Sequence, residues 1–123
     1  MSSDMEVEMA MEANIPGIVE IDEGVIQDMI GYVALTNYGV AGMASPSFSD
    51  GIATMLPMQK LRRGIKLKNN GESVDIELFI IVQDGTNLSV VSENLADTVR
   101  YALKEYLGVP VGELSINIQG VKA

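Results

Sequence analysis

The chain has 123 residues, of which 17 are acidic and 8 basic, so its formal net charge at pH 7 is −9. This charge repels phosphate backbones and removes the attraction that normally dominates nucleic-acid affinity, so we expect no binding to DNA or RNA. The sequence contains neither cysteine nor histidine. The chain therefore lacks disulfides, thiolate metal ligands, thiol nucleophiles and the commonest general base, which excludes most kinds of catalytic site.

Composition also indicates where the protein works. A chain of this length typically forms one domain around one core. No segment approaches the roughly 18 consecutive apolar residues of a membrane-spanning helix, and the N-terminus lacks the basic and then apolar pattern of a signal peptide. We therefore expect a cytoplasmic protein with no direct membrane insertion, whose contact with a membrane is at most peripheral.

The N-terminal residues are acidic and have no sustained period. Residues 1–14 mix methionine with acids and precede Pro16-Gly17, which predicts a disordered acidic N-terminal tail. A single domain is then expected over residues 15–123, beginning with a short β-prone run at 18–21. No lysine or arginine occurs before residue 24.

The next segment has helical spacing. Asp22 is placed to cap a helix over residues 25–38, whose apolar side chains recur at steps of three and four, and Gly39 is a natural stop. Residues 40–43 are expected to form a short strand, and residues 44–51, around Phe48, a loop. Residues 52–63 have helical spacing that Pro57 interrupts, which favours two short pieces over one helix.

An antiparallel hairpin follows. Residues 65–68 and 73–82 each alternate between apolar and polar side chains, and a turn is predicted at Asn69-Asn70-Gly71. One face of the second strand is wholly apolar. Its other face changes midway from polar, at Ser73, Asp75 and Glu77, to apolar, at Phe79 and Ile81.

The last third predicts a long helix and a strand. Asn87 can cap a helix whose apolar stripe runs over residues 88–106 and stops before Gly108, and residues 114–119 alternate as in a half-exposed strand. Helices and sheet can each bury the stripe that the other leaves exposed. The predicted fold class is α+β, a two-layer α/β sandwich with a mixed or mainly antiparallel sheet and two amphipathic helices packed on one face.

Motifs for chemistry are absent from the sequence. It contains neither the phosphate-binding G-x-x-x-x-G-K-[ST] pattern nor a G-x-S-x-G nucleophile turn. Asp75 and Glu77 project from the same strand face and could hold a cation or share a proton, or they could keep an exposed face soluble. We predict no catalytic residue, no metal ligand and no cofactor.

Two groups of residues are candidates for an interaction surface. The first is the basic cluster, five of the eight basic residues in nine positions: Lys60, Arg62, Arg63, Lys66 and Lys68. It is either a solvated face or a site that docks an acidic surface, such as anionic lipid headgroups or the acidic N-terminal segment of a neighbouring copy. The second is Phe79 with Ile81, which must be covered either by a loop of this chain or by another molecule.

Several ordered blocks of the sequence resemble the alkaline shock protein family, the small Gram-positive envelope stress proteins. The resemblance covers about residues 17–121. Its blocks are Ile21-Asp22-Glu23-Gly24-Val25-Ile26, Gly39-Val40-Ala41-Gly42-Met43, Gly64-Ile65-Lys66, Val74-Asp75, Ile80-Ile81-Val82, Gly85-Thr86-Asn87, Glu93-Asn94-Leu95 and Ile116-Asn117-Ile118-Gln119-Gly120-Val121. The chain departs from the family pattern at Gly24 and over residues 46–57.

The resemblance implies a function and partners. It implies a non-enzymatic, self-associating scaffold in cell-envelope homeostasis and stress response, hence a homo-oligomer, recruited to the inner face of the membrane by a membrane-anchored protein partner. The alternative is a small-molecule or lipid-headgroup adaptor that uses the basic cluster over residues 60–68. A carboxylate-dependent hydrolase using Asp75 and Glu77 is a third hypothesis.

Overall fold

The computed structural model describes residues 20–46 and 54–123. Its elements, in chain order, are α2 (Glu23–Thr36), β1 (Val40–Met43), the 3-10 helix η1 (Met58–Gly64), β2 (Ile65–Asn69), β3 (Val74–Gln83), α3 (Leu88–Leu107) and β4 (Val111–Lys122). The predicted tail at 1–14, the start of the β-prone run at 18–21, Phe48 and the start of the 52–63 segment lie outside the described residues.

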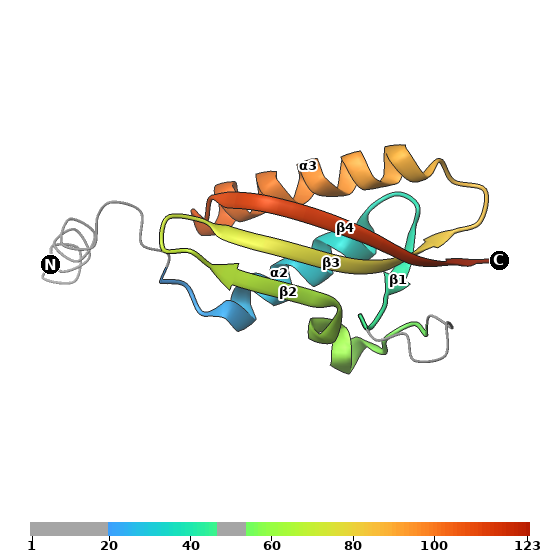
Figure 1. Cartoon of the computed structure of the whole chain (residues 1–123), viewed down its shortest axis with the longest axis horizontal. Helices are drawn as coiled ribbons and strands as arrows, with labels where there is room; N and C mark the ends of the chain where they lie inside the picture. The colour runs from blue at the N-terminus through green and yellow to red at the C-terminus, as the bar shows by residue number, and fades with distance from the viewer. Residues whose placement is uncertain (1–19, 47–53) are drawn as a thin grey trace, which may run out of the picture.

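The four strands form one mixed sheet around β3. Along one edge of β3, β2 pairs antiparallel with its first half and β1 antiparallel with its end. Along the other edge β4 runs parallel to β3, and α3 makes the connection between them. In Figure 1, α2 passes behind the sheet and α3 lies along its β4 side. The predicted α+β two-layer sandwich, with helices on one face of a mixed sheet, is confirmed.

Capping residues fix where the two long helices begin and end. The Asp22 carboxylate accepts a hydrogen bond from the Gly24 N–H at 2.6 Å, and Asn87 Oδ1 accepts one from the Val90 N–H at 3.1 Å. Side-chain acceptors here satisfy backbone donors that the first helical turn leaves free. At the end of α3, Gly108 adopts a φ of 67° and its N–H donates to the Lys104 carbonyl. Both predicted helices are therefore confirmed. The first runs two residues earlier than predicted at each end, and its C-cap is Asn37 and not the predicted Gly39. The second ends one residue later than its predicted stripe, and Gly108 follows it as expected.

The core lies between the helices and the facing side of the sheet. It is built from side chains with no exposed surface, among them Ile26 and Ile30 of α2, Leu78 and Ile80 of β3, and Leu95 and Leu103 of α3. Burying each such side chain contributes about 1.5–3 kcal/mol. No polar or charged residue is buried within the described ranges. Hydrophobic packing therefore fixes how the helices lie on the sheet.

The change of polarity on the second face of β3 follows from its neighbours. Asp75 and Glu77 lie beside β2, where Lys68 and Lys66 are their register partners. Ile81 lies where β1 has replaced β2 as the neighbour, and it packs with Phe79 and Ala44 in a second, smaller apolar cluster. One strand therefore has a charged half and an apolar half on the same face.

The segment around Pro57 differs from the prediction. The interpretation of two helical pieces is wrong for residues 54–57, because Met55 forms an isolated antiparallel bridge to Ala44 instead of a helical turn. Pro57 then stands at the N-cap of η1, where its missing N–H costs nothing. Within residues 20–46 and 54–123, no helix is both long and apolar enough to cross a bilayer.

Candidate functional site

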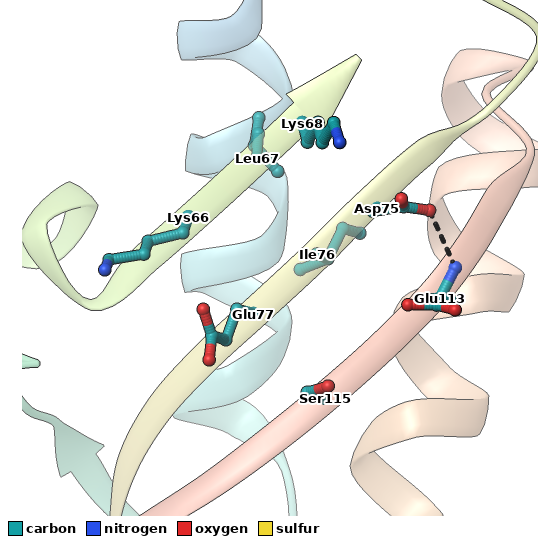
Figure 2. A pocket seen from close by; sticks show the side chains of 8 residues that line it. All are labelled: Lys66, Leu67, Lys68, Asp75, Ile76, Glu77, Glu113 and Ser115. Atoms are coloured by element: carbon teal, nitrogen blue, oxygen red, sulfur yellow. Dashed lines mark hydrogen bonds between the residues drawn. The ribbon is translucent and has the colours of Figure 1, made fainter. Parts of the chain in front are cut away.

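The face of the sheet that the helices leave uncovered carries a polar trough of about 510 Å³. Its walls come from three strands, as Figure 2 shows: Lys66, Leu67 and Lys68 from β2, Asp75, Ile76 and Glu77 from β3, and Glu113 and Ser115 from β4. The fold therefore brings part of the predicted basic cluster beside the predicted carboxylate pair.

Strand register pairs the charges of this trough across β2 and β3. Lys66 lies opposite Glu77 and Lys68 opposite Asp75. Opposite charges at directly opposed positions of an antiparallel pair attract one another. The trough holds two cations and three carboxylates. Its net charge is therefore negative, which disfavours the binding of an anionic ligand.

Asp75 is the most constrained group in the trough. Its Oδ1 accepts a hydrogen bond from the Glu113 N–H at 2.9 Å (Figure 2). Its Oδ2 accepts one from Asn70 Nδ2 at 2.7 Å. These two bonds, in that order, and then the charge of Lys68 lower the pKa of the Asp75 carboxyl. Asp75 therefore stays ionised and joins the β2–β3 turn to the start of β4.

This environment does not suit the hydrolase hypothesis. A carboxyl that shares a proton with a second one, or acts as a general acid, needs a raised pKa, and the Asp75 pKa moves in the opposite direction. Among the described residues, no group of three or more potential ligands has the geometry to hold a metal ion. Asp75 and Glu77 lie in the same trough, but each carboxylate accepts hydrogen bonds that join β3 to neighbouring segments: Asp75 from the Glu113 N–H and Asn70, and Glu77 from Asn117 Nδ2 at 3.4 Å. These contacts resemble those of a structural support.

The rest of the basic cluster lies elsewhere. Arg62 of η1 donates from Nε and Nη2 to the two carboxylate oxygens of Asp28 on α2, at 2.9 and 2.8 Å. This forked pair raises the pKa of Arg62 and lowers the pKa of Asp28. Lys60 and Arg63 are exposed on η1. The cluster is continuous in sequence, but the structure divides it between η1 and the uncovered sheet face.

Phe79 and Ile81 are covered within the chain. Only 7% of Phe79 and 5% of Ile81 is exposed, and the Lys66 ammonium lies 5.7 Å from the centre of the Phe79 ring. The sequence left open whether a loop of this chain or another molecule covers these two side chains. In the structure, this chain alone buries them. Their part in an interaction surface stays a prediction, because neither offers much area to another molecule in this conformation.

A second concavity, absent from the sequence-based predictions, lies between α2 and η1. This groove has a volume of about 590 Å³, and its lining is mainly apolar, with Gly31, Tyr32 and Leu35 from α2 and Met58 and Leu61 from η1. Tyr32 is 69% exposed and Met58 is 72% exposed. The Asp28–Arg62 pair lies in its wall and links the two helices. The three-residue spacing of Tyr32 with Leu35, and of Met58 with Leu61, was the signal available in the sequence.

The chain as a whole is similar to known proteins. Residues 11–123 match the model of the alkaline shock protein 23 family, which is described as having a cell envelope-related function. YloU of Bacillus subtilis, an uncharacterized protein, is 34% identical over 107 residues, 86% of this chain and 89% of that protein. Spy1614 of Streptococcus pyogenes, also uncharacterized, is 26% identical over 86% of this chain and 88% of its own length.

A solved structure resembles the fold. A variant of MamM-CTD superposes with a TM-score of 0.52 at 13% identity, covering 82% of this chain and all of that one. At this identity the likeness concerns the fold alone.

Proposed function

We propose that this chain, which belongs to the alkaline shock protein 23 family and shares its cell envelope-related function, is a non-catalytic interaction protein of envelope homeostasis and stress response. In this proposal the protein associates with itself, and a membrane-anchored protein partner brings it to the inner face of the cell membrane. The protein acts through its surfaces and transforms no substrate.

The apolar groove between α2 and η1 is the observation that carries this proposal. Tyr32 and Met58 line the same concavity as Leu35 and Leu61, so their exposed apolar surface is contiguous. Contiguous exposed apolar surface marks interaction sites, whereas single exposed apolar side chains do not. The Asp28–Arg62 pair and the contacts of Leu61 hold the two walls in place. A partner segment with one or two apolar side chains fits this groove, because its wall has few charges to desolvate.

The adaptor alternative is less well supported by the charges. A lipid headgroup needs several uncompensated cations, each contributing about 1 kcal/mol near an anionic surface. Arg62 is engaged by Asp28, and Lys66 and Lys68 lie opposite carboxylates. Lys60 and Arg63 on η1 remain, and two cations give weak attraction that physiological salt screens further.

The experiment is capture of the tagged full-length chain from crosslinked native membranes. Tyr32→Ala is the test variant and Tyr101→Ala, on α3 and 62% exposed, is the matched control. We expect the same membrane protein with the wild-type chain and the control, and at least a tenfold lower yield with Tyr32→Ala. Equal recovery by both variants would contradict the role of the groove. Flotation with protein-free anionic vesicles, lost in a Lys60→Gln/Arg63→Gln variant, would favour the adaptor instead.

A further inference from the structure

The outer edge of β4 is an unprotected strand edge. β4 has 12 residues and pairs only with β3, and within residues 20–46 and 54–123 no other strand lies beside it. A strand edge directs backbone N–H and C=O groups outward, where they can pair with another strand. The side chains of Leu114, Ile116 and Ile118 are only partly buried, whereas the β3 side chains that share their face are fully covered.

Protection is confined to the start of this edge. Arg100 of α3 donates from its two terminal nitrogens to the Val111 and Gly112 carbonyls, at 3.0 Å each. From Leu114 to Gly120 the strand has no charge and no proline, two of the devices that prevent edge pairing. A third device, a bulge, is present as a one-residue irregularity between Ile118 and Gly120.

The opposite side of the sheet contrasts with β4. On β2, Lys66 and Lys68 are both exposed, and an antiparallel pairing of two β2 strands would oppose lysine to lysine. In addition, Gln27 of α2 donates to the Ile65 carbonyl at 3.2 Å and occupies that group. The β2 edge is therefore guarded against a second copy, and the β4 edge is not.

β4 has opposite charges at its two ends, which suits antiparallel pairing with a second copy of the same strand. Glu113 stands near its start and Lys122 near its end, and both are exposed. A two-fold axis at Asn117 would place Ile116 of one copy opposite Ile118 of the other. The register shift between the Ile80 and Ile81 pairs adds one residue to β4. With Gln119 unpaired in this contact too, as it is against β3, Glu113 would lie opposite Lys122 of the second copy, once at each end of the interface.

We propose that β4 pairs with β4 of a second copy, antiparallel about Asn117, so that one continuous sheet crosses a two-fold dimer. This inference rests on the self-association stated under the proposed function and names its interface. A two-fold contact between identical edges closes on itself and gives a dimer rather than a filament. Two chains of net charge −9 repel one another, so the Glu113–Lys122 pairs act against a background that opposes association.

Charge reversal at the two ends tests the pairing. In the Lys122→Glu variant, two carboxylates would face each other at each end of the interface. In the Glu113→Lys variant, two ammonium groups would face each other there. Each variant should raise the dimer dissociation constant about tenfold or more, because two attractive pairs become repulsive. The double variant, Glu113→Lys with Lys122→Glu, restores both attractive pairs, so its dimer dissociation constant should return close to that of the wild type. An equimolar mixture of the two single variants should associate more tightly than either alone, because the ammonium group introduced in one species then faces the carboxylate introduced in the other.

The register is tested by a single cysteine in this cysteine-free chain. Asn117→Cys lies on the proposed axis, where directly opposed Cα atoms come within about 4.5–5.5 Å, a separation that a disulfide can bridge. Mild oxidation should give a covalent dimer of Asn117→Cys and little of Ser89→Cys, whose residue is exposed on α3. If the wild type dimerises but charge reversal leaves its dissociation constant unchanged and Asn117→Cys fails to crosslink, the β4 interface is wrong and self-association stands. A strictly monomeric wild type at high concentration overturns both.

Discussion

Gly39 offers the sharpest test of how the helix layer is held on the sheet. It connects α2 to β1 with a φ of 81°, its carbonyl accepts a hydrogen bond from the Gln83 N–H at 2.8 Å, and a Cβ placed on it would collide with Val91 Cγ2. Val91 is fully buried at the start of α3 and has no room to retreat. Replacement of Gly39 by alanine therefore meets two separate penalties.

The magnitude follows from those two penalties. The left-handed backbone costs a side-chain-bearing residue about 1–2 kcal/mol, and overpacking a tight core contact costs about 1–3 kcal/mol more. We expect Gly39→Ala to lower the free energy of unfolding by about 2–5 kcal/mol. Gly85→Ala is the matched control, because Gly85 has a φ of 83° and nothing lies within 4 Å of the position that a Cβ would take there, so only the first penalty applies.

The assay is urea denaturation followed by far-ultraviolet circular dichroism, with the slope of the transition checked for equality among variants. A double variant, Gly39→Ala with Val91→Ala, isolates the clash, and its loss should be smaller than the sum of the two single losses by about 1–3 kcal/mol. Equal losses for Gly39→Ala and Gly85→Ala, together with additivity in the double variant, would refute the reasoning.

The remaining predictions concern the core, the trough and the groove. Leu95→Ala in the fully buried stripe of α3 should cost about 2–5 kcal/mol of unfolding free energy in the same urea assay. The pKa of Asp75 is lowered on folding, so its stabilisation is present above the unfolded pKa and is lost as pH falls through the folded pKa. Asp75→Asn should therefore have a lower thermal midpoint than the wild type at pH 7, and the difference should shrink as the pH falls into the acid range. Arg62→Ala should leave the urea midpoint close to that of the wild type, because both partners of its ion pair with Asp28 are more than half exposed. A clear loss would mean that the pair supports more than the link between α2 and η1.

Local patterns were enough to predict most of the elements. Asp22 and Asn87 mark helix starts through side chains that cap their own following turn, which depends on neighbours a few residues away. The β2–β3 hairpin likewise follows from alternation and a short turn. In the 52–63 segment, by contrast, the helical spacing competed with a strand-like bridge between Met55 and Ala44, a tertiary contact that local spacing does not contain.

The site depended on pairings between residues far apart in sequence. The basic cluster is continuous in the chain, but a 3-10 helix ends and a strand begins inside it, and this change of period sends Arg62 toward Asp28, 34 residues earlier, and Lys66 to the uncovered face. The polarity change along β3 was visible in the sequence. Its cause, the replacement of β2 by β1 as the neighbouring strand, needed the sheet order.

The central claim is that this protein works by binding a copy of itself, and sedimentation velocity of the purified full-length chain over a roughly hundredfold range of concentration tests it most directly. We predict a weight-average sedimentation coefficient that rises from the monomer value toward that of a dimer, and a transition that shifts to lower concentration when moderate salt screens the net negative charge. A coefficient that stays at the monomer value across the whole range, at both salt concentrations, would contradict the account.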